Sequence, residues 1–181
     1  MVANIIIKYQ SLTESEAKII QSEIAKSPDI TGYSMEELLQ YKNVFKAYKG
    51  DEFAGCSINI DFGKIWTELG GFVVLLKFRG QGIGKLLYKI AYNDVIKRKR
   101  NIYIVSKNPA MIKIFQNSGL KIVHNFYQLP KAIWLYTIIF ALNWFRICNF
   151  IKSRFAPRKS AKFVFGYRLS TNINKSSAKV H

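Results

Sequence analysis

The fold of this chain is decided by the stretch Leu75-Leu76-Lys77-Phe78-Arg79-Gly80-Gln81-Gly82-Ile83-Gly84-Lys85-Leu86-Leu87, a glycine-rich turn between two apolar segments. The apolar run 71–76 before the turn is typical of a β-strand, and apolar residues return after it at helical spacing. Its three glycines leave backbone N–H groups uncovered, and the helix adds its unpaired first-turn donors and the positive end of its dipole. The sequence therefore predicts a strand, turn and helix that together bind an anion such as a phosphate group.

The spacing of the glycines excludes two common phosphate-binding motifs. A P-loop needs a glycine five residues before the Gly-Lys pair and a Ser or Thr after it, and Arg79 and Leu86 hold those places. A dinucleotide-binding turn needs a glycine where Lys85 stands. The pattern that remains, Arg79-x-x-Gly82-x-Gly84, resembles the acyl-CoA pyrophosphate signature of the GNAT superfamily of N-acyltransferases.

The flanking segments strengthen this resemblance. Residues 68–74 look like the fourth strand of that family, and residues 102–120 look like its strand, loop and helix that end in a Gly-hydrophobic pair. The resemblance covers about 47–123. It implies an α/β fold with a GNAT-like mixed, mostly antiparallel central sheet flanked by helices. Two strands splay apart beside the glycine turn in that fold, and the acyl-pantetheine arm lies in the gap.

The rest of the chain predicts alternating strands and helices. Capping boxes at Thr13 and Ser34, each followed three residues later by Glu, mark the starts of two helices, the first of which reaches about Ala25. A crossover from strand to helix to strand at the glycine turn predicts an α/β sandwich around a mixed sheet. The other expected elements are strands at 4–9, 43–48, 53–60, 65–74, 101–106, 120–127 and 161–169, and helices from the glycine turn to about 100 and over 109–117. In the resembled fold, the last strand pairs with the one at 120–127.

Length and composition favour one acyltransferase domain over residues 1–181, because 181 residues with 49% hydrophobic side chains suffice for a single core. Cys56 and Cys148 have no metal-ligand spacing, so we expect no metal and a reduced, cytoplasmic setting. The apolar run 5–7 is too short for a signal peptide.

The charge is divided along the chain. Residues 1–76 carry a net charge of −3, whereas residues 77–181 carry +20 with Asp94 as their only acid. One CoA molecule does not require so much positive charge, so the sequence predicts a second anionic partner, either RNA or an anionic membrane surface. The cluster 97–100 is typical of a solvated helix C-terminus, and a nucleic-acid contact is the alternative.

An aromatic, apolar insert at about 130–158 is the least ordinary segment. Residues 132–151 are long enough to cross a bilayer, but Asn143, Arg146 and Asn149 interrupt their second half. We expect helices that pack on the core, on a second subunit as a homodimer, or flat on a membrane surface as a peripheral contact. Residues 170–181 are expected to form a mobile tail.

The resemblance also implies roles for the residues of the turn and its strand. The backbone amides of Gly80, Gln81, Gly82, Ile83, Gly84 and Lys85 would bind the CoA pyrophosphate, and Arg79 would add positive charge. The main chain of Phe72, Val73 and Val74 would hold the pantetheine arm as an added strand, and a nearby N–H would polarise the thioester carbonyl. The alternative is a turn whose glycines serve its shape alone.

Candidate catalytic groups are fewer. Glu68 stands where many members of the family keep a carboxylate base, although an ordinary strand-end carboxylate paired with lysine is equally compatible with its position. Phe115 replaces the tyrosine that usually protonates the leaving thiolate, so water, Ser106 or Tyr103 would substitute for it, or the thiolate would leave unassisted. Asn108 matches a residue that contacts the cofactor or bridges the strands, and as a helix cap before Pro109 it has a structural role of its own.

The leading hypothesis is an N-acyltransferase that moves an acetyl or short acyl group from acyl-CoA to a primary amine by direct attack. The sequence does not identify the acceptor amine. One alternative is a membrane-surface-associated acyltransferase that acts on lipid-linked or protein amines. The other is a non-catalytic module that binds acyl-CoA or RNA.

Overall fold

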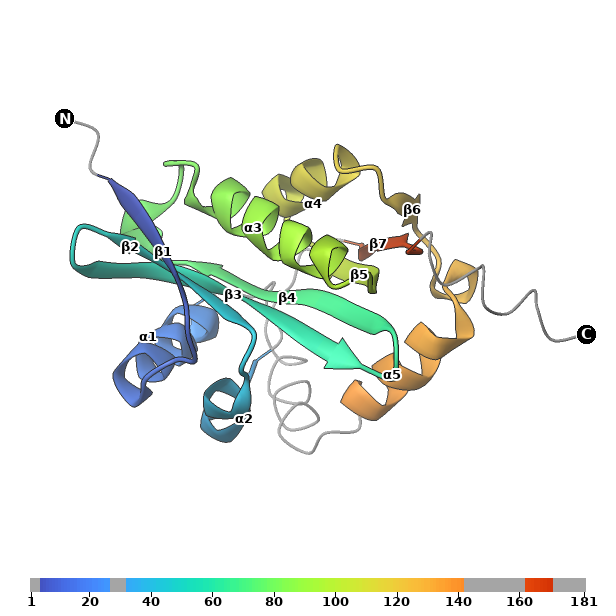
Figure 1. The fold of residues 1–181 in the computed structure, drawn as a ribbon, viewed down its shortest axis with the longest axis horizontal. Helices are drawn as coiled ribbons and strands as arrows, with labels where there is room; N and C mark the ends of the chain where they lie inside the picture. Colours follow the sequence, from blue (N-terminus) through green and yellow to red (C-terminus); the bar gives the residue numbers. More distant parts are fainter. Residues whose placement is uncertain (1–3, 27–31, 142–161, 171–181) are drawn as a thin grey trace, which may run out of the picture.

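A single seven-stranded sheet forms the centre of the molecule (Figure 1). The computed structural model describes residues 4–26, 32–141 and 162–170. The strand order is β1-β2-β3-β4-β5-β7-β6, and β4 and β5 are the parallel pair among antiparallel neighbours. This confirms the expected mixed, mostly antiparallel sheet. The strands are β1 (Ile5–Tyr9), β2 (Val44–Lys49), β3 (Glu52–Phe62), β4 (Trp66–Val74), β5 (Asn101–Ser106), β6 (Lys121–Val123) and β7 (Val164–Arg168).

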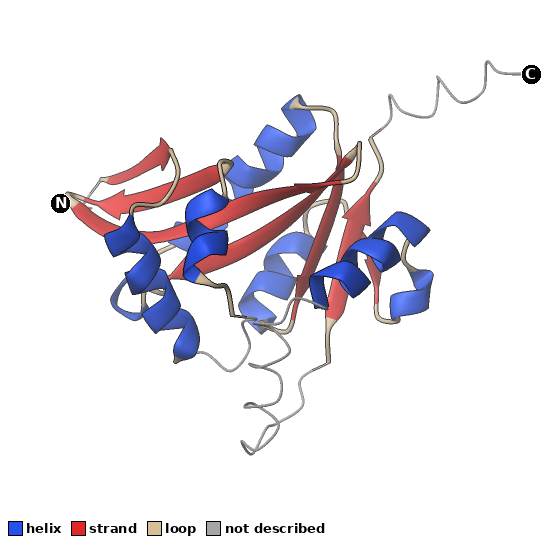
Figure 2. Cartoon of the chain, turned by 90° about the horizontal axis from the view of Figure 1, so that it is seen from below, coloured by secondary structure: helices blue, strands red, loops and turns tan. Residues whose placement is uncertain are grey.

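The helices cover both faces of the sheet (Figures 1 and 2). On one face lie α1 (Glu14–Ala25), α2 (Met35–Gln40) and α5 (Lys131–Ala141), and on the other lie α3 (Ile83–Lys97) and α4 (Pro109–Gln116). Between β4 and β5 the chain passes through the short 3-10 turn η1 (Leu76–Phe78), the glycine turn and α3. The predicted crossover is therefore confirmed.

The N-terminal helices begin where their capping boxes predict. Thr13 Oγ1 accepts a hydrogen bond from the Glu16 backbone N–H, and Glu16 Oε2 accepts one from the Thr13 N–H at 2.8 Å. Ser34 and Glu37 form the same reciprocal pair at the start of α2. Each box satisfies two N–H groups that the helix itself leaves unpaired.

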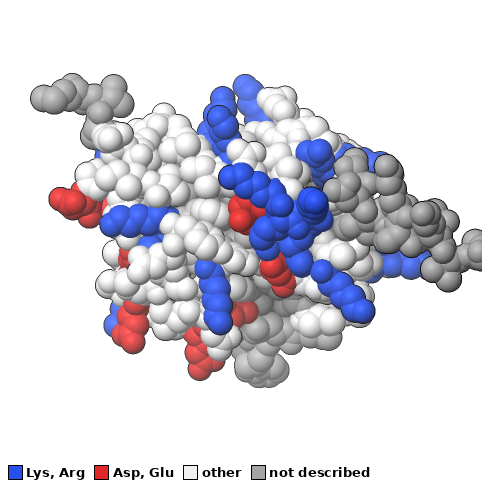
Figure 3. Space-filling model, viewed as in Figure 1, with Lys and Arg blue, Asp and Glu red and all other residues white. Residues whose placement is uncertain are grey.

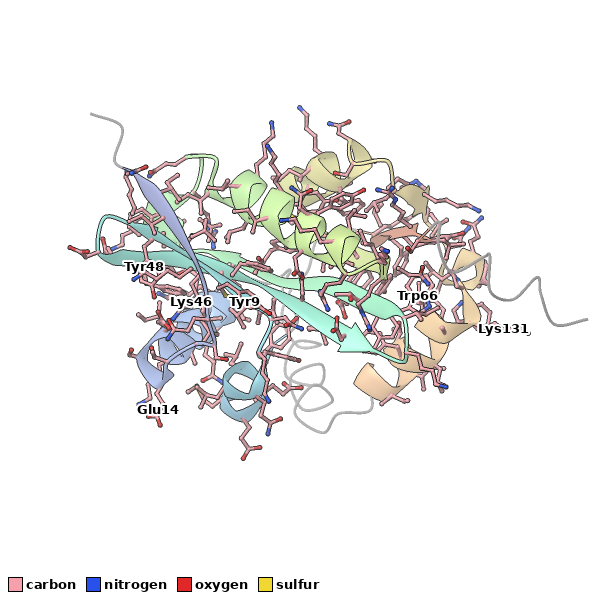
Figure 4. The ribbon with its side chains drawn as sticks, in the orientation of Figure 1. Tyr9, Glu14, Lys46, Tyr48, Trp66 and Lys131 are labelled. Carbon is pink, nitrogen blue, oxygen red and sulfur yellow. The ribbon has the colours of Figure 1, made fainter. Side chains whose placement is uncertain are left out.

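The main core lies between the sheet and α1 and α3, and it contains one buried ion pair. Lys46, which is 2% exposed, lies next to Tyr48 on β2, on the side of the sheet that carries α1 (Figure 4). Lys46 Nζ is 3.0 Å from Glu16 Oε2, and the Tyr48 hydroxyl donates to Glu16 Oε1. Burial acts to raise the pKa of Glu16, but hydrogen bonds from the Thr13 N–H, Tyr48 and Lys46 outweigh it and lower that pKa.

A second core cluster holds α5 against the opposite end of the sheet. Ile133 of α5 is fully buried, and Trp66 marks the end of β4 on which this helix packs (Figure 4). Within the described residues, the first part of the insert thus packs on its own core. The remainder of the insert, residues 142–158, and tail residues 171–181 lie outside the described residues. The buried members of the cluster are Trp66, Tyr103, Val123, Leu129, Ile133 and Phe165.

One expectation about the last strands needs correction. The strand expected at 120–127 ends at Val123, and residues 126–128 form a 3-10 turn (η2) instead. The reason is tertiary packing, because Phe126 stacks on Trp134 and its carbonyl accepts a hydrogen bond from the Trp134 indole at 2.9 Å. Strand β7 pairs with β6 as expected, but it also pairs with β5 and so lies between them.

Candidate functional site

The site begins where β4 and β5 part. The two strands pair at only three positions, from Trp66↔Asn101 to Glu68↔Tyr103, and then diverge. Residues 69–74 of β4 therefore have no strand beside them on the β5 side. The gap is a cleft of about 510 Å³. Its walls include Tyr33, Glu68, Leu69, Gly70, Gly71, Phe72, Val73, Val74, Arg79, Gly80, Gly82, Ile83, Gly84, Ile104, Val105, Ser106, Lys107, Asn108, Met111 and Ile114.

A β-bulge helps to turn β4 away from β5. Ile58 of β3 pairs with Gly70 and Cys56 pairs with Val73, so two residues of β4 oppose one of β3 between those pairs. Gly71 lies in the bulge with φ +56°, and a Cβ there would come within 2.7 Å of Ile58 Cγ1. The backbone conformation and the close packing both require glycine. The bulge leaves the cleft-side edge of β4 available to an extended chain that adds as a strand.

The glycine turn closes one end of the cleft with backbone donors. Gly80 and Gly82 have φ +77° and +81°, a conformation that glycine adopts without strain. Gly82 is the N-cap residue of α3, and no side chain accepts a capping hydrogen bond from the N–H groups of the first turn. The first helical hydrogen bond runs from the Leu86 N–H to the Gly82 carbonyl, so the N–H groups of the first turn remain for an external acceptor. No acid stands in that first turn, which suits an anionic ligand at the positive helix end.

Arg79 braces the turn from the side of α1. Its Nη2 lies 2.7 Å from Glu23 Oε1, and its Nε donates to the Val74 carbonyl at 2.9 Å. Glu23 also accepts the Leu76 N–H at 3.1 Å. Arg79 lines the cleft and is half exposed, so it adds positive charge beside the turn while it ties β4, the turn and α1 together.

Gln81 and Lys85 of the turn are not among the residues that line the cleft. Gln81 is exposed, donates to the Lys77 carbonyl and accepts from Lys49 Nζ. The Lys85 side chain is also exposed, and that of Ile83 is buried in the core. A contact of Gln81 or Lys85 with a ligand in the cleft would therefore come from the backbone, and the cofactor-binding role expected for both residues stays a prediction.

The β5 wall holds two of the predicted positions. Asn108 caps α4, since its Oδ1 accepts from the N–H groups of Ala110 at 2.9 Å and Met111 at 3.2 Å. It also lines the cleft, so the cap and a ligand contact are compatible. Ser106 lies beside it, and its Oγ accepts the Asn108 N–H at 3.0 Å. The hydroxyl proton of Ser106 remains for another acceptor.

Phe115 lies in the core, away from the cleft walls. Its side chain is fully buried, and it packs close to Gly166 of β7. A phenyl ring has no proton to give to a leaving thiolate. Tyr103, one of the substitutes that the sequence suggested, is also buried and faces α5. Of the two side chains expected to replace the missing tyrosine, the structure brings only Ser106 to the cleft.

Glu68 is a buried carboxylate at the point where the strands part. It is 6% exposed and lines the cleft. Tyr136 of α5 donates a hydrogen bond to Glu68 Oε2 at 2.5 Å, and its ring stacks on Phe62 with 3.9 Å between centroids. Burial and then the Glu68 carboxylate raise the pKa of Tyr136 far above its ordinary value, so the hydroxyl stays protonated and donates to the carboxylate.

Sequence reasoning missed two of the tyrosines near this carboxylate, Tyr136 and Tyr33. Tyr136 sits in the aromatic insert, 68 positions after Glu68, and no local pattern links the two. Tyr33 reaches the cleft from the segment before α2, and its hydroxyl would lie 3.5 Å from a Cβ at Gly70, as would Glu68 Oε1. By contrast, the sequence could place Ser106 and Lys107 at the cleft, because they directly precede Asn108 at the end of a predicted strand.

The matching family model covers the glycine turn, the splayed strands and α4, but not Tyr136 of α5. The model that is described as the acetyltransferase (GNAT) family matches residues 14–120, from α1 through the glycine turn to the end of α4. The chain belongs to the GNAT acetyltransferase family. The predicted resemblance is thus confirmed, and this acetyltransferase continues beyond the match with α5 and β7. No curated protein matches the chain in sequence.

Solved structures share the fold of this acetyltransferase at low sequence identity. N-acetylglutamate synthase from Neisseria gonorrhoeae, complexed with coenzyme A, is 12% identical with a TM-score of 0.63 and covers 91% of this chain, which spans 35% of that enzyme. Rv2747 from Mycobacterium tuberculosis, in complex with CoA, is 10% identical with a TM-score of 0.64, over 91% of this chain and 99% of its own. The ribosomal-protein-S18-alanine N-acetyltransferase from Escherichia coli is 12% identical with a TM-score of 0.54, over 91% of both chains.

Two further observations concern metal sites and membrane spans in the described part of the acetyltransferase. Across residues 4–26, 32–141 and 162–170, no three His, Cys, Asp or Glu side chains converge as metal ligands would. In the same residues, every helix is too short or too polar to cross a bilayer.

Proposed function

We propose that this chain transfers an acetyl or short acyl group from acyl-CoA to a primary amine. The observation that carries the proposal is the single cleft that joins the glycine turn at one end to the buried Glu68 where the strands part. The turn suits a pyrophosphate, because no side chain caps the first turn of α3 and there is open space beside Gly80 and Gly82. The pantetheine arm would add to the free edge of β4 and lead the thioester toward Glu68.

The proposed reaction is one direct displacement. Glu68 accepts a proton from the acceptor ammonium group, directly or through a water molecule, because an ammonium group has no lone pair for attack. The amine nitrogen then bonds to the thioester carbon, the carbon–sulfur bond breaks, and CoA leaves as a thiolate. A backbone N–H beside the cleft stabilises the charge on the carbonyl oxygen. The attacking nitrogen still carries one surplus proton after it bonds to carbon, and this proton passes to the leaving thiolate through water or through the Ser106 hydroxyl on the cleft wall. Glu68 returns its own proton to solvent when the products leave.

Release of free thiol from acetyl-CoA in the presence of an amine panel tests this function. Lysine peptides, polyamines and N-terminal peptides serve as acceptors, and a chromogenic disulfide reports free CoA. We expect turnover with at least one amine class and a loss of about a hundredfold or more in Glu68→Gln, the usual contribution of a general base. Unchanged turnover in Glu68→Gln would refute its role as base. Acetyl-CoA binding without turnover of any amine would favour the non-catalytic alternative.

One observation favours a second candidate, an acyltransferase at a membrane surface. Three large apolar side chains of α5, Leu135, Ile138 and Ile139, are 63%, 53% and 62% exposed on the side away from the sheet. Such a stripe suits a helix that lies in a bilayer surface. Flotation with vesicles of phosphatidylglycerol and phosphatidylcholine tests it. Binding that the double variant Leu135→Ser, Ile139→Ser loses would support a peripheral location, and no binding by the wild type would refute this second candidate.

A further inference from the structure

A row of lysines follows the exposed side of α3. Lys85, Lys89 and Lys97 are exposed at successive turns of the helix, with Asn93 in the intervening place, and Lys99 follows its end. Residues four apart are neighbours on a helix surface, separated by about 6 Å along the axis. Figure 3 shows Lys and Arg gathered over this helix and its end, while most of the Asp and Glu visible in the same view lie toward its left and lower part. We call Lys89, Lys97 and Lys99 the lysine ridge; Lys85 is left out because it belongs to the glycine turn.

The acidic side chains near α3 form ion pairs with arginines. Asp94 is 2.9 Å from Arg98 Nε, and Asp61 is paired with Arg98 at 2.7 Å and Arg100 at 3.4 Å. In the described residues no acid lies within ion-pair distance of the three ridge lysines. The sequence after Asp94 contains no Asp or Glu side chain, so no later part of the chain supplies one. Lys97 and Lys99 lie at the C-terminal end of α3, where the helix dipole favours cations, but none of the ion pairs of the described residues involves them or Lys89. The ridge therefore presents positive charge that can meet an external anion.

The position of the ridge argues against a bilayer as its partner. A membrane-binding face presents large apolar side chains beside its cations, but Ile96, at 37%, is the only large apolar side chain of α3 that is exposed. The exposed apolar stripe of α5 lies on the opposite face of the sheet (Figures 1 and 2). A flat bilayer cannot touch both faces at once.

The extent of the ridge also exceeds what acyl-CoA requires. The pyrophosphate seat occupies the first turn of α3, whereas Lys97 lies about 18 Å from Lys85 along the axis at about 1.5 Å per residue. A flexible strand with phosphates at regular intervals matches a line of point charges on a polar helix. We propose that the lysine ridge binds the phosphodiester backbone of single-stranded RNA, on the face of the sheet opposite α1 and α2.

The test measures RNA binding by the full chain. Fluorescence anisotropy of a labelled 15-nucleotide polyuridine is followed over a series of KCl concentrations. One variant carries Lys89→Gln, Lys97→Gln and Lys99→Gln. A matched control carries Lys18→Gln, Lys42→Gln and Lys131→Gln, which removes the same charge from exposed lysines elsewhere. Calorimetric titration with acetyl-CoA shows whether each variant keeps its fold and its cofactor seat, since no ridge residue lies in that seat.

We expect the wild type and the control to bind the RNA, and the ridge variant to bind at least about tenfold more weakly at low salt. Single strands give a slope of about 0.7 in log K against log [salt] for each phosphate neutralised, so the ridge variant should lose about 2 from its slope. No binding by the wild type, or equal losses in the ridge and control variants, would overturn the proposal. Binding to anionic vesicles that the ridge variant alone loses, with RNA binding unchanged, would overturn it as well. Failure of acyl transfer would leave this result unaffected.

Discussion

Tyr136 of α5 donates a hydrogen bond to Glu68 of β4 across 2.5 Å, although the two residues stand 68 positions apart. The tyrosine comes from a helix that lies beyond the matched family residues, and the carboxylate lines the cleft proposed to bind acyl-CoA. The insert is thereby joined to the candidate active site. Within the described residues, its first helix holds the proposed base in place.

Replacement of this tyrosine tests that connection. A hydrogen bond donated to a carboxylate favours the charged form, so Tyr136→Phe should move the acid limb of the kcat/KM profile to higher pH. Stacking on Phe62 is retained by a phenyl ring, so the fold should be kept. Tyr33 and Tyr103, the other tyrosines near Glu68, are unchanged in this variant. A difference between the two profiles is therefore due to the Tyr136 hydroxyl. A kcat/KM that falls equally at all pH values, with no shift of the acid limb, would indicate that Tyr136 has a purely structural role.

The bulge glycine gives a prediction about stability. Gly71→Ala puts a Cβ within 2.7 Å of Ile58 in a left-handed conformation, so it should cost roughly 2–4 kcal/mol from the two effects together. Gly63→Ala is the matched control, because Gly63 has φ +52° but nothing within 4 Å of its added Cβ. We expect that control to cost only about 1–2 kcal/mol of backbone strain. Urea unfolding measures both, and equal costs would show that the bulge tolerates a side chain.

The buried pair of Lys46 and Glu16 predicts how stability depends on pH. Because the pKa of Glu16 is lowered in the folded chain, its contribution is present above the unfolded value near about 4.3 and is lost as the pH falls through the folded value. Glu16→Gln should therefore flatten the acid limb of the stability curve. Lys46→Met, which leaves the carboxylate buried without its cation, should cost about 3 kcal/mol near pH 7. An unchanged acid limb in Glu16→Gln would contradict the assignment.

Local patterns in the sequence predicted much of the fold. Hydrogen bonds between residues three apart fix the starts of α1 and α2, and the conformation of a glycine fixes the start of α3. These helix starts could therefore be predicted from the sequence alone. The hairpin of β2 and β3 and the crossover at the glycine turn follow from the same short-range signals. The family resemblance then supplied the splayed strands.

What the sequence did not predict depends on long-range packing. Strand β6 stops at Val123 because Phe126 packs against Trp134 of α5, and β7 enters the sheet beside β5. The ion pair of Arg79 and Glu23 and the hydrogen bond of Tyr136 and Glu68 also join segments more than fifty residues apart. No pattern within one element indicates such partners.

Calorimetric titration with acetyl-CoA tests the central claim, that the glycine turn and the splayed strands form an acyl-CoA seat. The wild type is compared with Gly82→Asp, which places a negative charge at the cap of α3, and with Gly63→Asp, which makes the same change in an open left-handed turn of the β3–β4 connection. We predict micromolar binding by the wild type and by Gly63→Asp, and a loss of about tenfold or more in Gly82→Asp through repulsion of the pyrophosphate. No binding by the folded wild type, or equal binding by both variants, would contradict the account.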